Sequence, residues 1–272
     1  MAENLFEHVQ DQVKEWEISK SLGLHIPLPE IIPGHPITKF MLLEVIAALL
    51  IAIIFIPLAR RAAKGGLPKG PWWNLFESFL TFIRDDVAKP NLGEHDADRF
   101  VPFLWTLFVF ILFMNLLGMI PFLGSPTGSM AVTGGLAIIS FLMIHGAAIA
   151  KMGPIEYIVS LWPHLDLPLP ARLPIALLIF VIELISSMIK SFVLAVRLFA
   201  NMFAGHMVLS TILGFIVMAA NAGIILWGGV TVASVLGVVA LSLLELFVAF
   251  LQAYIFVFLT ALFIGMAIHP AH

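Results

Sequence analysis

Three ionisable side chains recur at a seven-residue interval inside one long apolar stretch: Glu183, Lys190 and Arg197. Seven residues make two helical turns with an offset of about 20°, so these side chains share one helix face. Asn201, four residues after Arg197, extends the same face. An arginine at the centre of a bilayer costs between about 2.5 and 17 kcal/mol. Such a residue indicates a partner, a water-filled cavity or an ion pathway, so ion conduction is the chemistry that this face suggests.

A second apolar stretch carries Glu245 and Gln252, which are also seven residues apart. His206 follows Arg197 by nine residues, which puts it on the opposite side of the first helix. If the two stretches fold back on each other near residue 222, position 206 comes beside position 238. Glu245 is then displaced from His206 by about two turns. Both a direct contact and two separately hydrated groups remain compatible with this spacing.

Each of these residues also has an interpretation without a transport role. Lys190 can extend its long stem to water or to a neighbour, and Glu183 can simply line the cytoplasmic mouth, since it lies nine residues after Pro174. Arg197 is far from both ends of its apolar run, so its side chain is not expected simply to reach water at the membrane surface. His145 lies near the end of another apolar span and is given no role.

The composition is that of an integral membrane protein. Hydrophobic residues make up 61% of the 272 residues, charged residues make up 11%, and the mean hydropathy is +1.05. Soluble domains are about 25% charged, so this chain could not cover a water-exposed surface. The net charge of -3 excludes a nucleic-acid-binding patch, and the lack of cysteine excludes disulfides and thiolate sites.

Motifs for other chemistries are missing from the sequence. There is no His-Glu-x-x-His pattern of a zinc protease and no Gly-x-Ser-x-Gly elbow of a hydrolase. There is also no phosphate-binding loop and no histidine pair spaced to hold a metal or a haem. We therefore expect no metal and no other cofactor.

The pattern predicts an all-α polytopic membrane protein. Apolar runs of about 20 residues cross the bilayer core, and amphipathic segments lie in its interface. The predicted order begins with an outside amphipathic helix (3–17) and Pro-rich linker within 1–36, a first transmembrane helix at 37–60, and a cytoplasmic or interfacial amphipathic helix within 61–99. It continues with a transmembrane hairpin at 100–151, a cytoplasmic loop with a short interfacial helix at 152–173, and two long helices within 174–272.

The last two apolar runs, 174–220 and 222–267, are too long for one upright span each. As helices they would measure roughly 70 Å, more than twice the bilayer core. Either each run is broken into two spans, or each is one strongly tilted helix. No proline lies between Ile175 and Ile268, and no polar turn divides either run. The sequence therefore favours two long tilted helices joined near 221–223.

The distribution of positive charge predicts the orientation. The first span ends in Arg60, Arg61, Lys64 and Lys69, and the hairpin ends in Lys151. Because Lys and Arg favour the cytoplasmic side, the N-terminus should lie outside and the C-terminus should be cytoplasmic. The expected location is the cell (inner) membrane, which the chain crosses several times.

Three segments then resemble the signatures of one family. The segment 191–206, SFVLAVRLFANMFAGH, resembles the signature of subunit a of F-type ATP synthase. The segment 251–256, LQAYIF, resembles the second signature, and 113–121, FMNLLGMIP, resembles a third. Their order and separations fit, and the resemblance covers nearly the whole chain.

The resemblance implies two near-horizontal membrane helices that wrap against a ring of c subunits. It implies that Arg197 is the essential arginine, which faces the carboxylate of the ring. The other implied roles are beside the ion path for Asn201 and Gln252, at the cytoplasmic-side exit for Glu183, and in the opposite half-channel for the pair His206 and Glu245.

The chain departs from the family pattern at three places. His206 and Glu245 are exchanged relative to many bacterial members, as in mitochondrial members. Gly118 stands where the family often has an acidic residue, so an acid cannot be required there. Ser191 stands where relatives often have proline.

The resemblance also implies the partners. They are the c ring, the b subunits of the peripheral stalk, the rest of the ATP synthase complex and the lipid bilayer, with no nucleic acid. The chain would be a non-catalytic subunit of the complex, with Lys190 as a further candidate for the ion path. The main alternative is a secondary transporter with a mid-membrane ion-pair switch, which would need internal repeats and broken helices. A membrane enzyme is a second alternative and would need a nucleophile or a metal cluster.

Overall fold

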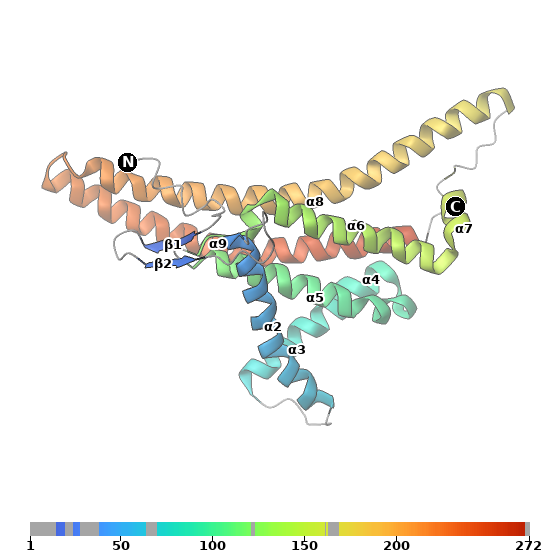
Figure 1. Cartoon of the computed structure of the whole chain (residues 1–272), viewed down its shortest axis with the longest axis horizontal. Helices are drawn as coiled ribbons and strands as arrows, with labels where there is room; N and C mark the ends of the chain where they lie inside the picture. The colour runs from blue at the N-terminus through green and yellow to red at the C-terminus, as the bar shows by residue number, and fades with distance from the viewer. Residues whose placement is uncertain are drawn as a thin grey trace. The chain divides into compact units, whose positions relative to one another are not determined.

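The computed structural model of the chain describes residues 15–19, 24–27, 38–63, 70–120, 123–160, 162 and 169–269. Within these ranges the chain is mainly helical, and Figure 1 shows its elements. Their bounds are β1 (Glu15–Ser19), β2 (Leu24–Pro27), α2 (Lys39–Ala63), α3 (Pro71–Phe82), η1 (Ile83–Ala88), α4 (Lys89–Leu92), α5 (Glu94–Gly118), η2 (Pro126–Gly128), α6 (Met130–Met152), α7 (Pro154–Ser160), α8 (Leu169–Ala219) and α9 (Ile224–Ile268).

Five of the described helices are long and apolar enough to cross a membrane. They are α2, α5, α6, α8 and α9. In a bilayer every backbone N–H and C=O must be satisfied within the protein, and a helix does this by itself. The prediction of an all-α polytopic membrane protein is confirmed.

Helix α8 is continuous over 51 residues and α9 over 45 residues. Figure 1 draws each of them as one unbroken helical ribbon. Gly205 and Gly237, two glycines in the middle of these runs, both lie inside helices. The two helices are joined at 220–223, where Gly223 has a φ of 92° that favours glycine. The prediction of two long helices, and not four short spans, is therefore confirmed.

The N-terminal segment differs from its prediction. Glu15–Ser19 is a strand that pairs antiparallel with Leu24–Pro27, with Trp16 opposite Ile26. Residues 15–19 alternate polar and apolar side chains, which suits a strand, and pairing with β2 outweighs the helical spacing of the stripe. The predicted helix is therefore wrong for 15–17, and 3–14 lie outside the described residues.

Two further helix boundaries differ from those predicted from the sequence. The interfacial segment predicted up to residue 99 is α3, the π-helical turn η1 and α4, and α5 already begins at Glu94. Two acidic residues in its first turn, Glu94 and Asp96, favour this earlier start because they complement the helix dipole. The short helix expected in the loop at 152–173 is present as α7, but α8 begins within this loop, at Leu169.

The chain forms two compact units. Unit 1 is Met1–Lys69, Phe108–Val132 and Leu198–Tyr254, and unit 2 is Gly70–Leu107, Thr133–Arg197 and Ile255–His272. In unit 1, Phe40 and Leu43 of α2 are buried in a cluster. In unit 2, α9 passes so close to α4 that a Cβ on Gly265 would lie 2.0 Å from the Asn91 carbonyl oxygen. Only glycine allows this approach.

Candidate functional site

Unit 1 brings His206 of α8 and Glu245 of α9 together. The distance between His206 Nε2 and Glu245 Oε1 is 4.0 Å, and the side chains are 15% and 9% exposed. The sequence left open whether these residues meet, and in the structure they do. A buried imidazole beside a carboxyl group can exchange a proton with it.

The register of the helix hairpin explains this contact. Gly237 faces Ile212, since a Cβ at 237 would lie 3.9 Å from the Cγ2 atom of Ile212. Counting along both helices from this pair places position 206 beside 243, and not beside 238. The turn at 220–223 thus shifts the pairing by about one helical turn and brings Glu245 within reach.

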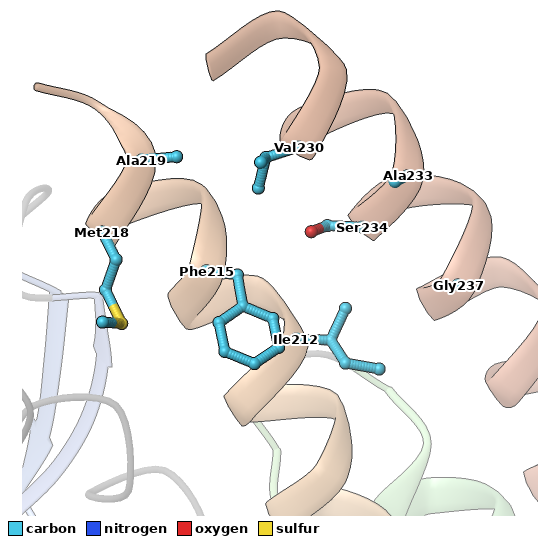
Figure 2. A pocket seen from close by; sticks show the side chains of 8 residues that line it. All are labelled: Ile212, Phe215, Met218, Ala219, Val230, Ala233, Ser234 and Gly237. Carbon is cyan, nitrogen blue, oxygen red and sulfur yellow. The ribbon is translucent and has the colours of Figure 1, made fainter. Parts of the chain in front are cut away.

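The far end of the same hairpin is apolar. A cavity of about 600 Å³ lies between the last turns of α8 and the first turns of α9. Figure 2 shows the side chains that line it. Ser234 supplies the one hydroxyl among its lining residues. The lining residues are Ile212, Phe215, Met218, Ala219, Val230, Ala233, Ser234 and Gly237. Polar side chains gather elsewhere in unit 1, around Glu245.

A second cavity of about 190 Å³ lies where these polar side chains meet. Asn201, Gly205 and Glu245 line it together with apolar side chains. Among the described residues, Asn201 Nδ2, His206 Nε2 and Glu245 Oε1 are buried and have no hydrogen-bond partner. Leaving such atoms unpaired costs about 1–3 kcal/mol each, and a cluster of them marks a functional site more than a stabilising one.

A buried hydrogen-bond network holds α9 close to this site. Asn115 Nδ2 of α5 donates to the Ala249 carbonyl oxygen at 3.1 Å, and Thr127 Oγ1 donates to Asn115 Oδ1 at 2.8 Å. The Ser125 hydroxyl lies 2.8 Å from that of Thr127. Ala249 is one turn after Glu245, and Gln252, half-buried, follows it by three residues. The network therefore fixes the stretch of α9 that carries both polar residues.

Gly118, at the end of α5, has no space for a side chain. A Cβ there would lie 2.5 Å from Ser125 Cβ and 2.9 Å from Ser125 Cα. An acidic side chain at this position would collide with the Ser125–Thr127 turn.

Unit 2 contains the charged residues of the first half of α8. Glu183 is exposed, whereas Lys190 and Arg197 are half-buried. Lys190 Nζ lies 5.7 Å from the centroid of the Phe263 ring, a cation–π contact that gives Lys190 a packing role. Arg197 forms no ion pair with any residue in the described part of the chain.

His145 could not be connected with this region from the sequence alone. In the structure His145 of α6 is hydrogen-bonded through Nδ1 to the Tyr157 hydroxyl, and its Nε2 lies 2.8 Å from Ser187 Oγ. Ser187 is one turn after Glu183 on α8. No spacing rule connects 145, 157 and 187, because three separate helices bring them together.

The comparisons with known proteins agree with these motifs. A family model described as "ATP synthase A chain" matches residues 41–265. An "ATP synthase subunit a" of Anaeromyxobacter dehalogenans (strain 2CP-C) is 37% identical over 252 residues, which are 92% of this chain and 62% of the relative. That of strain 2CP-1 is 44% identical over 203 residues, 74% of this chain and 50% of the relative. That of Chloroherpeton thalassium is 41% identical over 256 residues, 92% of this chain and 72% of the relative. The chain thus spans only part of the length of the two Anaeromyxobacter relatives.

Proposed function

The chain belongs to the ATP synthase A chain family, and we propose that it is the proton-conducting stator subunit of a rotary F-type ATP synthase. Two half-channels that do not meet open to opposite sides of the membrane and serve carboxylates on a ring of c subunits. The observation that carries the proposal is Arg197, an arginine within a 51-residue helix that has no ion-pair partner in the described part of the chain.

The outside half-channel uses the site in unit 1. A proton arrives at His206 and Glu245, whose polar atoms are 4.0 Å apart and buried. It then passes to a carboxylate of the ring beside the cavity lined by Asn201 and Gly205. Once neutral, that carboxyl group can enter lipid, which a charged carboxylate could not do cheaply. Gln252 completes the polar surface beside this path.

Arg197 separates the two half-channels. Its positive charge favours the ionised form of the rotor carboxylate that faces it, and it repels a proton moving straight from one side to the other. Arginine stays charged in proteins, whereas a desolvated lysine can lose its proton. The barrier therefore requires a guanidinium and not an ammonium.

The cytoplasmic half-channel uses Glu183, the exposed carboxylate of α8. After nearly a full turn of the ring, each carboxyl group reaches this side and releases its proton. Each charge that crosses yields about 2.3 kcal/mol per 100 mV of membrane potential. Lys190, packed on Phe263, contributes positive potential to this side of α8.

The orientation has the N-terminus outside and the C-terminus in the cytoplasm. In unit 2, Lys151 Nζ at the end of α6 lies 2.6 Å from Asp96 Oδ2 at the start of α5. His269 Nε2, just after α9, lies 3.3 Å from the same oxygen. These three ends lie together, so the cytoplasmic preference of Lys151 extends to the end of α9.

The proposed partners are the c ring, the b subunits of the peripheral stalk, the rest of the complex and lipid. Affinity purification of the tagged chain from membranes in mild detergent tests this assignment. We expect an oligomeric ring of small hydrophobic subunits to co-purify with it. Recovery of the chain as a monomer or homodimer that exchanges ions by itself would favour the secondary transporter. The continuous helices α8 and α9 already disfavour that class, since such transporters bind ions at broken helices.

A further inference from the structure

His145 lies at the centre of three polar side chains from three helices of unit 2. The Tyr157 hydroxyl of α7 is hydrogen-bonded to its Nδ1, and the Ser187 hydroxyl of α8 lies 2.8 Å from its Nε2. A hydroxyl can both donate and accept a hydrogen bond, and an imidazole can bind a proton at one nitrogen while it releases one at the other. The three groups thus form an unbroken chain of proton carriers.

Aromatic contacts fix the orientation of the imidazole. The Phe141 ring lies with its centroid 4.1 Å from that of His145 at 62°, and the Tyr157 ring lies at 5.9 Å and 65°. His145, Tyr157 and Ser187 are all half-buried. A ring held between two aromatic neighbours keeps both nitrogens aimed at their hydroxyl partners.

Glu183 lies one turn before Ser187 on α8, so it shares the helix face of this cluster. Burial, and then the negative charge of Glu183, raises the pKa of the Tyr157 phenol. Tyr157 therefore keeps its hydroxyl proton at neutral pH, and it experiences the charge of the Glu183 carboxylate. Glu183 is exposed, so it can exchange that proton with water.

We propose that Ser187, His145 and Tyr157 form a proton relay that delivers protons to Glu183 in the cytoplasmic half-channel. This inference rests on the function proposed above. It gives a transport role to His145 and to α7, which lie outside the three segments that resemble the family signatures.

The transfer balances one proton in against one proton out. A proton reaching Ser187 from the rotor side moves the serine hydroxyl proton onto His145 Nε2. The Nδ1 proton passes to the Tyr157 oxygen, while the phenol gives its own proton to the Glu183 carboxylate. Water restores the starting tautomer by giving one proton to Nδ1 and taking one from Nε2, and the reverse sequence operates when the complex hydrolyses ATP.

The competing interpretation is that the cluster only attaches α7 to its neighbours. Substitutions that keep the packing but remove one hydroxyl distinguish a proton relay from a purely structural cluster. Tyr157→Phe and Ser187→Ala are therefore made in the whole ATP synthase complex. Ser186→Ala is the matched control, since Ser186 is the next residue and is also half-buried. We expect ATP-driven proton pumping in vesicles to fall by about tenfold for the first two variants, less than the full loss of a positioned proton carrier because water substitutes in part. The control should pump normally.

Chemical rescue of His145→Ala gives a readout that a change in packing alone would not affect. Added imidazole should restore pumping in a concentration-dependent manner, whereas pyrazole, a ring of the same size and a far weaker base, should not. Rescue by both rings, or by neither, would overturn the relay and leave His145 as a packing residue. If His145→Ala does not assemble, the two hydroxyl variants decide, and normal pumping by both would overturn the relay.

The outcomes distinguish this inference from the proposed function. Normal pumping by the cluster variants, combined with loss of pumping in Arg197→Ala, would refute only the relay. Normal pumping by Arg197→Ala would refute the proposed function itself, whatever the cluster variants do.

Discussion

Gly205 of α8 lies directly against the carboxyl group of Glu245 on α9. A Cβ at position 205 would come within 2.8 Å of Glu245 Oε1 and 3.3 Å of its Cδ. The missing side chain leaves the space that the carboxyl group occupies beside His206. The proton site of unit 1 therefore depends on a glycine as much as on its two titratable residues.

Gly205→Ala should impair transport without preventing assembly. The atom in the way is the far end of a flexible side chain, so Glu245 can move aside, and its geometry with His206 is lost. We expect a reduced rate of ATP-driven pumping at normal subunit yield, measured with a pH-sensitive dye in vesicles.

Gly237→Ala is the matched control for this substitution. It is another mid-helix glycine of the same hairpin, and its Cβ would meet Ile212 at an ordinary 3.9 Å. It should leave pumping intact and stabilise α9 by about 0.5–1 kcal/mol, since alanine favours a helix more than glycine does. Equal pumping by the two variants would show that Gly205 has no special role.

Gly118→Ala should destabilise unit 1. The new Cβ meets the Cβ and the backbone of Ser125, and overpacking of this kind costs about 1–3 kcal/mol. Thermal unfolding of the purified complex measures the effect, with Gly128→Ala as the control because its Cβ would lie 3.8 Å from Ser125. Adding Ser125→Gly should restore part of the loss. An unchanged melting temperature for Gly118→Ala would contradict the described packing.

The helical architecture could be predicted from the sequence, whereas the contacts of the site could not. An apolar run without proline specifies a continuous helix, because the membrane leaves the backbone no other way to satisfy its hydrogen bonds. The contact of His206 with Glu245 depends on how the turn at 220–223 shifts the register by about one helical turn, and no periodicity reports that. The strand at Glu15–Ser19 was missed because a short segment can fit both a helical stripe and an alternating pattern.

The cluster around His145 was unpredictable for a related reason. A histidine near the end of an apolar span usually lies at the interface, and its partners here come from a short helix and a distant part of α8. The contacts of Gly118 and Gly205 could not be predicted from the sequence either. Their importance is visible only when the atoms of Ser125 and Glu245 are in place.

His206 and Glu245 should be functionally coupled. Each single change to alanine should slow proton flux, since a proton passes between the two groups. The exchanged double variant, His206→Glu with Glu245→His, should recover part of the flux because it keeps one imidazole and one carboxyl group in contact. Proton uptake by vesicles measures all four proteins. Strictly additive losses without recovery would show two independent hydrated groups.

The orientation can be tested by cysteine labelling, which is clean because the sequence has no native cysteine. A single cysteine at Lys64 should react with a membrane-impermeant maleimide only from the cytoplasmic side. A cysteine at Ala2 should react only from the outside and serves as the opposite control. Labelling of position 64 from the outside alone would invert the topology.

The most direct test of the account is proton movement through the complex that carries Arg197→Ala. The substitution removes the charge that holds the rotor carboxylate ionised and opens the gap between the half-channels. Arg197→Lys should fail as well, because a desolvated ammonium can release its proton and lacks the guanidinium's forked donors. In reconstituted vesicles with a pH dye, ATP-driven pumping should vanish in both variants. The passive proton leak through the membrane sector of Arg197→Ala should persist or rise. Pumping by Arg197→Ala at a rate near that of the unaltered complex would show that the arginine is only structural and that the proposed mechanism is wrong.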